Sequence, residues 1–462
     1  MDELRERLFY SPKNGYDLIT TGERIDAENY CRAYMEYLNN SRIEREAVEN
    51  AVVLAEKNGF VEYRPGMELR AGDKIYSNNR GKALMLAVIG SRPLSDGLVI
   101  AGAHVDSPRL DLKQLPLYES DELCYLRTHY YGGIKKYQWV TIPLELHGVV
   151  ALKSGEVLSV CIGREPDEPR FVITDLLPHL AKDQVKKTMA EGITGENLHI
   201  LIGSAPYADE GKDRVKLAVL SILNDAYGIT EEDFLSAELM AVPAFDVCEI
   251  GLDRSLIGGY GHDDRVCAFA ALRAILDIEA PERTCVCLLC DKEEIGSEGV
   301  TSMQSAAFDT FVKDLCETQG VPLRRCFEKS FCLSNDVTAA YDPLYAEVSE
   351  KRNSSLVNYG VGIDKFTGVR GKSGSNDASA ETIAYLRGLF EKKGVVWQMA
   401  ELGKVDQGGG GTIAKFMARR NIETIDAGVP VLSMHAPFEV VGKLDCYMTY
   451  KAVLAAFEDD RA

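Results

Sequence analysis

The sequence predicts an α/β fold, in which a mixed sheet flanked by helices is interrupted by a smaller β-rich domain. Two observations lead to this prediction. Apolar strand-like runs alternate with amphipathic helical patterns over residues 1–113 and again over 246–462. Between them, residues 114–245 change to alternating, hairpin-like runs and polar, acidic segments. We therefore expect one α/β domain formed by both outer ranges and an inserted β-rich domain at 114–245.

Length and charge limit the classes of partner. The chain has 462 residues, 46% of them hydrophobic, which is enough for a large core and favours two domains. Its 71 acidic residues exceed its 52 basic ones, giving a net charge of −19. Nucleic acids and anionic membranes need basic patches, so we expect neither as a partner. The start, MDELRERLFYSPKNG, lacks an apolar signal core and no apolar run could span a bilayer, so we expect a cytoplasmic protein.

The first half of the chain gives clear helix and strand patterns. Residues 22–58 carry apolar positions at spacings of three and four and end at Gly59, which predicts two amphipathic helices. The runs ALMLAVIGS and GLVIAGAHVDSP follow as apolar strands separated by turn residues. Their closeness in sequence predicts that they are neighbours in the sheet.

The second half continues the alternation. YGHDDRVCAFAALRAILDIEA predicts a helix, and RTCVCLLCDKEEIGSEG predicts a buried strand that runs into a loop. Cys285, Cys287 and Cys290 fall inside that strand with no second Cys/His pair nearby, so we expect buried thiols rather than a metal site. GVPVLSMHAP and DCYMTYKAVLAAFED complete the pattern with a strand and a terminal helix.

Four apolar runs end at side chains that can bind metals. LVIAGA ends at His104, CVCLLC ends before Glu293, CLSN ends at Asp336, and VPVLSM ends at His435. An open α/β sheet displays functional groups at the carboxyl ends of its strands, so these segments should converge on one edge. Imidazole nitrogens and carboxylate oxygens together bind divalent cations. The sequence therefore predicts a hydrolytic metal centre.

The spacing of these residues suggests separate roles. His104 and Asp106 are two apart on an extended segment, so both side chains point to one side and Asp106 can orient the imidazole. Glu293 and its neighbour Glu294 point in different directions, so one can bind metal while the other faces the attacking water. Asp263, in GHDDR, is the candidate to bridge two cations about 3.5–4 Å apart. We expect two zinc ions, although cobalt or manganese would fit the same donors.

Such a centre would hydrolyse an amide. The cations would lower the pKa of a shared water and polarise the carbonyl, and Glu293 would take the proton and pass it to the leaving amine. A carboxypeptidase or deacylase could use the same ligands. A catalytically idle assembly protein is the alternative from another class, and the intact Glu293 and complete ligand set argue against it.

A glycine-rich segment, Gly408–Thr412, precedes a helical run. It lacks the spacing and the Lys-Ser/Thr pair of a phosphate-binding loop. Backbone at Gly410 could approach the substrate closely, with amides at the helix start facing an oxyanion or an acidic group. A flexible turn without a ligand is the alternative.

The chain resembles the aspartyl aminopeptidase family of co-catalytic zinc exopeptidases. The resemblance rests on AGAHVDSPRLDLK, GHDDRVCAF, DKEEIGSEG, SNDVTAAYDP, DQGGGGTIAKF and SMHAPFE, in this order. It implies a zinc-exopeptidase fold, peptides as substrates, a dimerising role for the inserted domain, and a homo-oligomer, a tetrahedral dodecamer built from dimers. It also implies the role of each residue at the centre: His104 and Asp336 on one metal, Glu294 and His435 on the other, Asp263 on both, Glu293 as general base, and Asp106 orienting His104.

The substrate pocket departs from this family. His179 in LLPHLA resembles the histidine that reaches a neighbouring subunit's active site, although an ordinary surface histidine is the alternative. Lys365 resembles the substrate-contacting lysine, but a family histidine is missing at Ala339 and a tyrosine at Ser373. A buried substrate carboxylate would lose hydrogen bonds worth roughly 1.5–3 kcal/mol each. We therefore expect Leu or Met at the substrate amino terminus to be cleaved at least as well as Asp or Glu.

Overall fold

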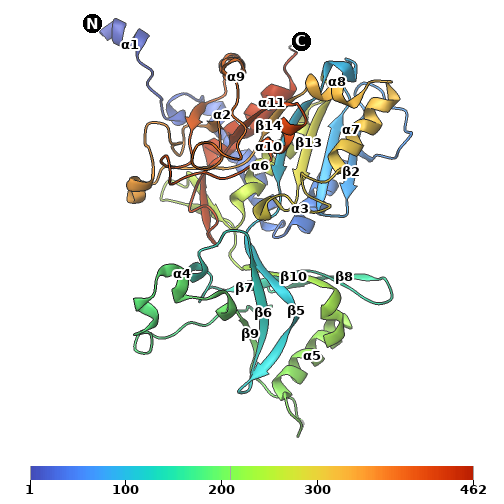
Figure 1. Ribbon diagram of the computed structural model, residues 1–462, viewed down its shortest axis with the longest axis vertical. Helices are drawn as coiled ribbons and strands as arrows, with labels where there is room; N and C mark the ends of the chain where they lie inside the picture. The colour runs from blue at the N-terminus through green and yellow to red at the C-terminus, as the bar shows by residue number, and fades with distance from the viewer. Residues whose placement is uncertain (1, 209, 461–462) are drawn as a thin grey trace.

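A nine-stranded mixed sheet forms the centre of the computed structural model, which describes residues 2–208 and 210–460 (Figure 1). Its strand order is β1-β2-β3-β13-β4-β14-β18-β16-β17. The neighbours β13, β4, β14 and β18 run parallel, so their carboxyl ends meet at one edge. The predicted class, a mixed sheet flanked by helices, is confirmed. The strands are β1 (Val61–Glu62), β2 (Lys74–Asn79), β3 (Ala83–Val88), β4 (Val99–His104), β13 (Cys285–Cys290), β14 (Phe331–Ser334), β16 (Val361–Asp364), β17 (Trp397–Ala400) and β18 (Glu423–Gly428).

The order of the central strands corrects one prediction. Strands β3 and β4 are not neighbours, because β13 lies between them, antiparallel to β3 and parallel to β4. All three strands are buried along their whole length. Apolar side chains on both faces identify a central strand but carry no information on its neighbours.

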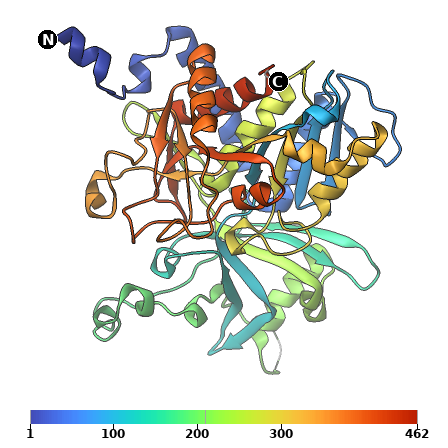
Figure 2. The same cartoon turned by 45° about the horizontal axis from the view of Figure 1, so that its top comes forward.

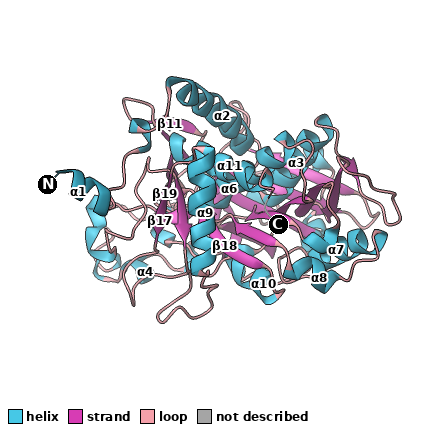
Figure 3. Cartoon of the chain, turned by 90° about the horizontal axis from the view of Figure 1, so that it is seen from above, coloured by secondary structure: helices cyan, strands magenta, loops and turns pink. Residues whose placement is uncertain are grey.

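Helices cover both faces of this sheet (Figure 3). Two apolar cores follow, one on each face. The two helices predicted within residues 22–58 are confirmed, and the first starts at a capping box formed by Thr20 and Glu23. One face carries α2 (Thr21–Asn39), α3 (Glu44–Lys57), α6 (His262–Asp277), α9 (Ala380–Lys393) and α11 (Lys443–Phe457), the other α7 (Ala307–Thr318), α8 (Leu323–Glu328) and α10 (Ala414–Arg419), and α1 (Asp2–Leu8) precedes them all.

A second, six-stranded sheet lies below the first in Figures 1 and 2. Its order is β8-β7-β10-β5-β6-β9, with antiparallel pairs throughout. Strand β5 begins at Arg109, so it crosses the boundary predicted at residue 113. The division into domains stays a prediction. The elements are β5 (Arg109–Ser120), β6 (Leu123–Tyr131), β7 (Leu144–Ala151), β8 (Val157–Ile162), β9 (Ile200–Gly203), β10 (Ala237–Pro243), α4 (Met189–Gly192) and α5 (Arg214–Tyr227).

Buried ion pairs join the second sheet to the start of α3. His147 Nδ1 on β7 lies 2.5 Å from Glu46 Oε1 on α3. Arg42 Nε, just before α3, lies 3.3 Å from Glu145 Oε1, and both side chains are 1% exposed. Breaking either pair would leave a buried charge without its partner, which is costly.

A third sheet of five strands, ordered β11-β12-β20-β19-β15, lies beside the functional residues. It includes β19, the strand before His435, which was expected at the edge of the main sheet. His435 therefore approaches from a different sheet, because β19 pairs with β20 and β15. The strands are β11 (Cys248–Ile250), β12 (Leu256–Gly259), β15 (Thr338–Ala339), β19 (Pro430–Leu432) and β20 (Glu439–Gly442).

Two further expectations can be compared with the structure. All twelve cysteines are free, and Cys285, Cys287 and Cys290 are buried in β13, as predicted. Among the described residues, no helix is both long and apolar enough to cross a membrane.

Candidate metal centre

The five side chains predicted as metal ligands lie together at the carboxyl edge of the main sheet. Each comes from a different element. His104 ends β4, Asp263 lies in the first turn of α6, Glu294 follows β13, Asp336 follows β14, and His435 follows β19.

The carboxylate of Asp263 lies between two histidines. Its Oδ1 is 3.2 Å from His104 Nε2, and its Oδ2 is 3.2 Å from His435 Nε2. Asp263 is 3% exposed and His104 is 2% exposed. One carboxylate thus offers an oxygen to each of two adjacent positions, which is the arrangement of a bridging ligand.

A further carboxylate flanks each histidine. Asp336 Oδ1 is 3.8 Å from His104 Nε2, and Glu294 Oε2 is 3.6 Å from His435 Nε2. Ligand atoms of His104, Asp263 and Glu294 all lie within 4.8 Å of one another, and so do those of His104, Glu293 and Asp336. Nitrogen and carboxylate donors in this number suit zinc.

The charge of this cluster also favours cations. Burial, together with the nearby Asp263 carboxylate, raises the pKa of Glu294 well above its usual range. Burial and the Asp264 carboxylate do the same to the pKa of Asp336. Glu294 Oε1 and Asp264 Oδ1 are buried without a hydrogen-bond partner. Unpaired buried carboxylates are costly, and divalent cations held among them would compensate that charge, so the residues fit a metal centre.

Both imidazoles are turned so that Nε2 faces the centre. His104 Nδ1 lies 3.0 Å from the Asp106 backbone oxygen and 3.3 Å from its Oδ1. His435 Nδ1 lies 2.8 Å from the backbone oxygen of Gly133. A carbonyl oxygen only accepts, so Nδ1 carries the hydrogen in both rings. In the neutral form of each ring, which metal binding requires, the Nε2 lone pair points at the acidic cluster.

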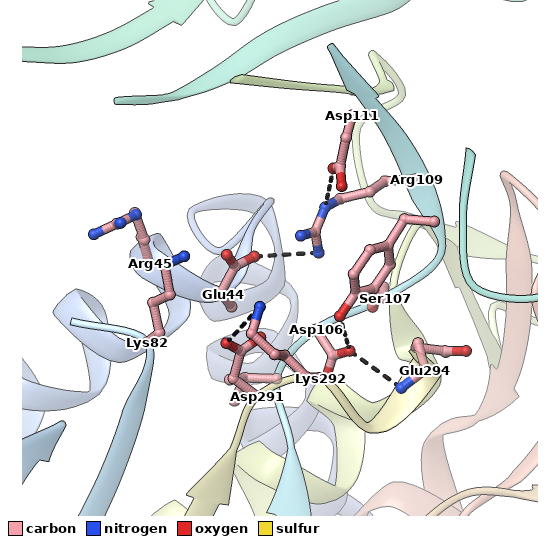
Figure 4. A network of polar contacts seen from close by, with 12 residues as sticks. Glu44, Arg45, Lys82, Asp106, Ser107, Arg109, Asp111, Asp291, Lys292 and Glu294 are labelled. Carbon is pink, nitrogen blue, oxygen red and sulfur yellow. Dashed lines mark hydrogen bonds and ion pairs between the residues drawn. The ribbon is translucent and has the colours of Figure 1, made fainter. Parts of the chain in front are cut away.

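Asp106 is fixed by a dense set of donors (Figure 4). Its carboxylate is fully buried and accepts hydrogen bonds from the backbone amides of Glu293 at 3.1 Å and Glu294 at 3.2 Å. The hydroxyl of Tyr131, at the end of β6, donates to Asp106 Oδ2 at 2.8 Å. Burial raises the pKa of Asp106, but His104, the Tyr131 hydroxyl and the charge of Arg109 lower it more, so the pKa is lowered overall.

Figure 4 shows that this network continues away from the centre. The guanidinium of Arg109 lies 3.9 Å from the centroid of the Tyr131 ring. Arg109 also pairs with Glu44 on α3 at 3.2 Å and with Asp111 at 2.8 Å. Tyr131 is thus held between the second sheet and the metal centre.

His435 is constrained at its backbone as well as its ring. Its φ of +64° lies in the left-handed region, which a residue other than glycine adopts only where the surroundings compensate the strain. Its amide donates to Glu439 Oε1 at 2.7 Å. Gly132 also has a positive φ, +72°, and a Cβ there would lie 3.2 Å from Glu294 Oε2. The turn after β6 therefore passes close to both ligands.

A cavity of about 460 Å³ opens on the centre, and Glu293 lines it. Burial raises the pKa of Glu293 to about 7. Apolar side chains of Val337, Leu402 and Met434 line another part of the wall, and Gly410 lines it through the glycine-rich segment. The cavity can therefore hold a side chain next to the metal centre.

Two residues predicted to contact substrate do not line this cavity. Lys365 Nζ pairs with Asp377 at 3.3 Å. His179 belongs to the segment between β8 and α4 of the second sheet, and its reach into a neighbouring subunit stays a prediction.

Sequence reasoning missed several residues of the site. Asp264 had a signal, because it is adjacent to Asp263. Tyr131, Gly133 and Glu439 had none, since they act on partners far away in the sequence. Asp364, the last residue of β16, lines the cavity in place of the neighbouring lysine.

Comparisons with known proteins agree with this geometry. The sequence profile described as "Aminopeptidase I zinc metalloprotease (M18)" matches residues 37–457. A probable M18 family aminopeptidase 1 of Clostridium acetobutylicum is 49% identical over 95% of this chain and 96% of its own length. The crystal structure of an M18 family aminopeptidase from Thermotoga maritima has a TM-score of 0.94 and 42% identity, covering 97% of this chain and 100% of that one. The S. cerevisiae mApe1 dodecamer shares the fold at 20% identity, with a TM-score of 0.75 over 93% of this chain and 96% of that one.

Proposed function

The chain belongs to the aminopeptidase I zinc metalloprotease (M18) family, and on this premise we propose how its centre works. It is a zinc-dependent aminopeptidase, which removes residues from the amino terminus of peptides. The observation that carries the proposal is the Asp263 carboxylate, which lies 3.2 Å from a ring nitrogen of each of two histidines.

Two zinc ions would be held by the five clustered side chains. Asp263 would contact both ions, His104 and Asp336 would complete one site, and Glu294 and His435 the other. When bound, zinc acts as a Lewis acid that activates a water and polarises the scissile carbonyl. The separate flanking carboxylate beside each histidine supports two ions rather than one.

Glu293 would serve as the general base. It takes a proton from the attacking water and then delivers it to the nitrogen of the leaving amine. Its side chain lines the cavity while its backbone amide is tied to Asp106. This anchoring supports a fixed position for the carboxylate relative to the ligands.

Asp106 would act through other residues. It holds His104 by its ring nitrogen and the amides of Glu293 and Glu294 by its carboxylate. One buried side chain therefore positions a ligand of one ion, a ligand of the other ion, and the base.

Substrate binding involves the cavity wall. We assign Gly410 to the approach of peptide backbone, because it lines the cavity and lacks a side chain that would block access. His179 would contribute from a neighbouring subunit. Lys365 would contact only a part of the substrate that extends beyond the cavity, since its ammonium pairs with Asp377.

Assembly and location complete the proposal. The chain would form a homo-oligomer, a tetrahedral dodecamer built from dimers, with the second sheet at the dimer contact. Leu180, Val185 and Met189 in that region are 69%, 75% and 66% exposed, and large exposed apolar groups mark interaction surfaces. A cytoplasmic location is supported by twelve free cysteines, which are typical of a reducing compartment.

The experiment that tests this function uses metal removal and return. The purified protein is stripped with a chelator, zinc is added back, and hydrolysis of Leu-Gly-Gly is compared with that of its N-acetylated form. Zinc should restore release of free leucine from the first peptide only. Cleavage of the acetylated peptide, or release of the carboxyl-terminal glycine from either peptide, would contradict an aminopeptidase activity.

A further inference from the structure

An acidic side chain lies in the wall of the substrate cavity, outside the metal centre. Asp364 ends β16 and is 5% exposed. It lines the cavity together with the apolar residues Val337, Leu402 and Met434. The wall therefore combines one carboxylate with an apolar surface.

Asp364 has no cationic partner in the described part of the chain. No lysine, arginine or histidine there lies within 4.0 Å of its carboxylate, whereas the next residue, Lys365, pairs with Asp377. Its neighbour across the strands, Asp426 on β18, is in register with it and accepts a hydrogen bond from Thr412 at 2.7 Å. Asp364 is left with the Thr338 hydroxyl and, among the described residues, no cation, and it lines the cavity.

The surroundings of Asp364 disfavour its ionised form when no cation is nearby. Burial, followed by the Asp426 carboxylate, raises its pKa to about 7, against a lowering effect of Thr338. Lys415 is the sole lysine or arginine among the described residues that line the cavity. Its charge acts on Glu293, where it lowers the pKa. A cation that entered the cavity would stabilise the charged form of Asp364.

The apolar wall selects the kind of cation. Lysine and arginine carry three or four methylenes before their charged group, and such stems pack on apolar surface while the head reaches a polar partner. A small inorganic cation would leave that apolar surface without a contact. The methylene stem of a basic side chain suits the apolar part of this wall, and its charged head suits the carboxylate of Asp364.

We propose that Asp364 is a specificity residue that receives the ammonium or guanidinium of a lysine or arginine at the substrate amino terminus. This inference rests on the proposed aminopeptidase function and adds its substrate class. The methylene stem packs against Val337, Leu402 and Met434, and the charged head pairs with the buried carboxylate.

The test compares substrates that differ only in the charged group. Lysine and norleucine share the linear stem, so kcat/KM for Lys-anilide and norleucine-anilide is measured on the zinc-loaded protein. A charge-assisted hydrogen bond in a buried site favours the lysine substrate by about 10- to 100-fold. A ratio of one or below would overturn the proposal. Failure to cleave either anilide, or any unblocked peptide, would instead refute the aminopeptidase function.

Three variants test whether Asp364 causes the preference for lysine over norleucine. Asp364→Asn should lower the lysine-to-norleucine ratio of kcat/KM at least tenfold, because it removes the charge that only the lysine substrate uses. Asp364→Glu keeps the charge and should keep the preference for lysine. Asp377→Asn, outside the cavity, is the control and should leave the ratio unchanged.

A binding measurement compares the two side chains without any contribution from catalysis. Titration calorimetry of lysinamide and norleucinamide into zinc-loaded Glu293→Gln should give the same preference, which Asp364→Asn added to that background should abolish. An equal loss for both ligands in Asp364→Asn would overturn the proposal, because it would assign Asp364 to the shared α-amine or to structure. Circular dichroism of each variant excludes unfolding as the cause.

Discussion

Tyr131→Phe should weaken zinc binding although Tyr131 is not one of the proposed zinc ligands. Phenylalanine keeps the ring that packs on Arg109 and removes only the hydroxyl that donates to Asp106 at 2.8 Å. A hydrogen bond to a charged group contributes about 1.5–3 kcal/mol. Asp106 would keep the amides of Glu293 and Glu294, so we expect the lower end of this range, about 1.5 kcal/mol. That corresponds to roughly tenfold in zinc affinity, at the low end of the effects typical of such outer partners.

The assay is a zinc competition with a fluorescent chelator, paired with kcat and KM for a leucine substrate. Tyr130→Phe is the matched control, because Tyr130 is adjacent in sequence but 42% exposed. A zinc affinity of Tyr131→Phe equal to that of Tyr130→Phe would refute the positioning role of the hydroxyl. An equal fall in thermal stability for both variants would not bear on that role.

Three other predictions test separate parts of the site and fold. Glu293→Gln should keep both zinc ions by metal analysis yet lose about 10²–10⁴-fold in kcat, and loss of metal matching that of Glu294→Gln would mean that the two roles are exchanged. Asp336→Ala and His435→Ala should each lose a different zinc ion, as crystallography of each variant would reveal, and loss of the same ion from both would contradict the assignment. His147 is buried, which lowers its pKa, but hydrogen bonds to neighbouring thiol and carboxylate groups raise it to about 11. Because the pKa of His147 is higher in the folded state, its stabilisation is full below pH 6.5 and is lost as pH rises towards 11. The free energy of unfolding, measured with urea, should therefore fall on the order of 1–3 kcal/mol between pH 6.5 and 9.5. This fall should be absent in His147→Gln.

Local sequence patterns predicted which side chains lie together at the candidate metal centre. His104, Glu294 and Asp336 follow apolar runs that became central strands, and the carboxyl ends of parallel strands meet at one edge. Helix periodicity likewise predicted α2, α3 and α6. These features depend on residues close together in the sequence, which is why a single sequence reveals them.

Long-range pairings were beyond such patterns. Strand β13 lies between β3 and β4. Because all three strands are apolar on both faces, hydrophobicity does not fix their order. The hydrogen bond from Tyr131 to Asp106 spans 25 residues, and the contact from Gly133 to His435 spans 302. No local spacing encodes either contact.

The residue expected to contact the substrate and the residue that lines the cavity are adjacent in the sequence. The family resemblance predicts substrate contact at Lys365. Successive side chains on a strand point to opposite sides, and Asp364 is the residue that lines the cavity. This difference of one residue reverses the charge presented to the substrate, from a lysine that suits acidic residues to a carboxylate that suits basic ones.

The most direct test of the dinuclear centre is anomalous diffraction from zinc-loaded crystals, recorded above and below the zinc absorption edge. Two peaks of similar height should flank the carboxylate of Asp263, one beside His104 and Asp336, the other beside Glu294 and His435. Their separation should be about 3.5–4 Å. A single peak, or peaks distant from Asp263, would contradict the two-ion centre on which the proposed mechanism depends.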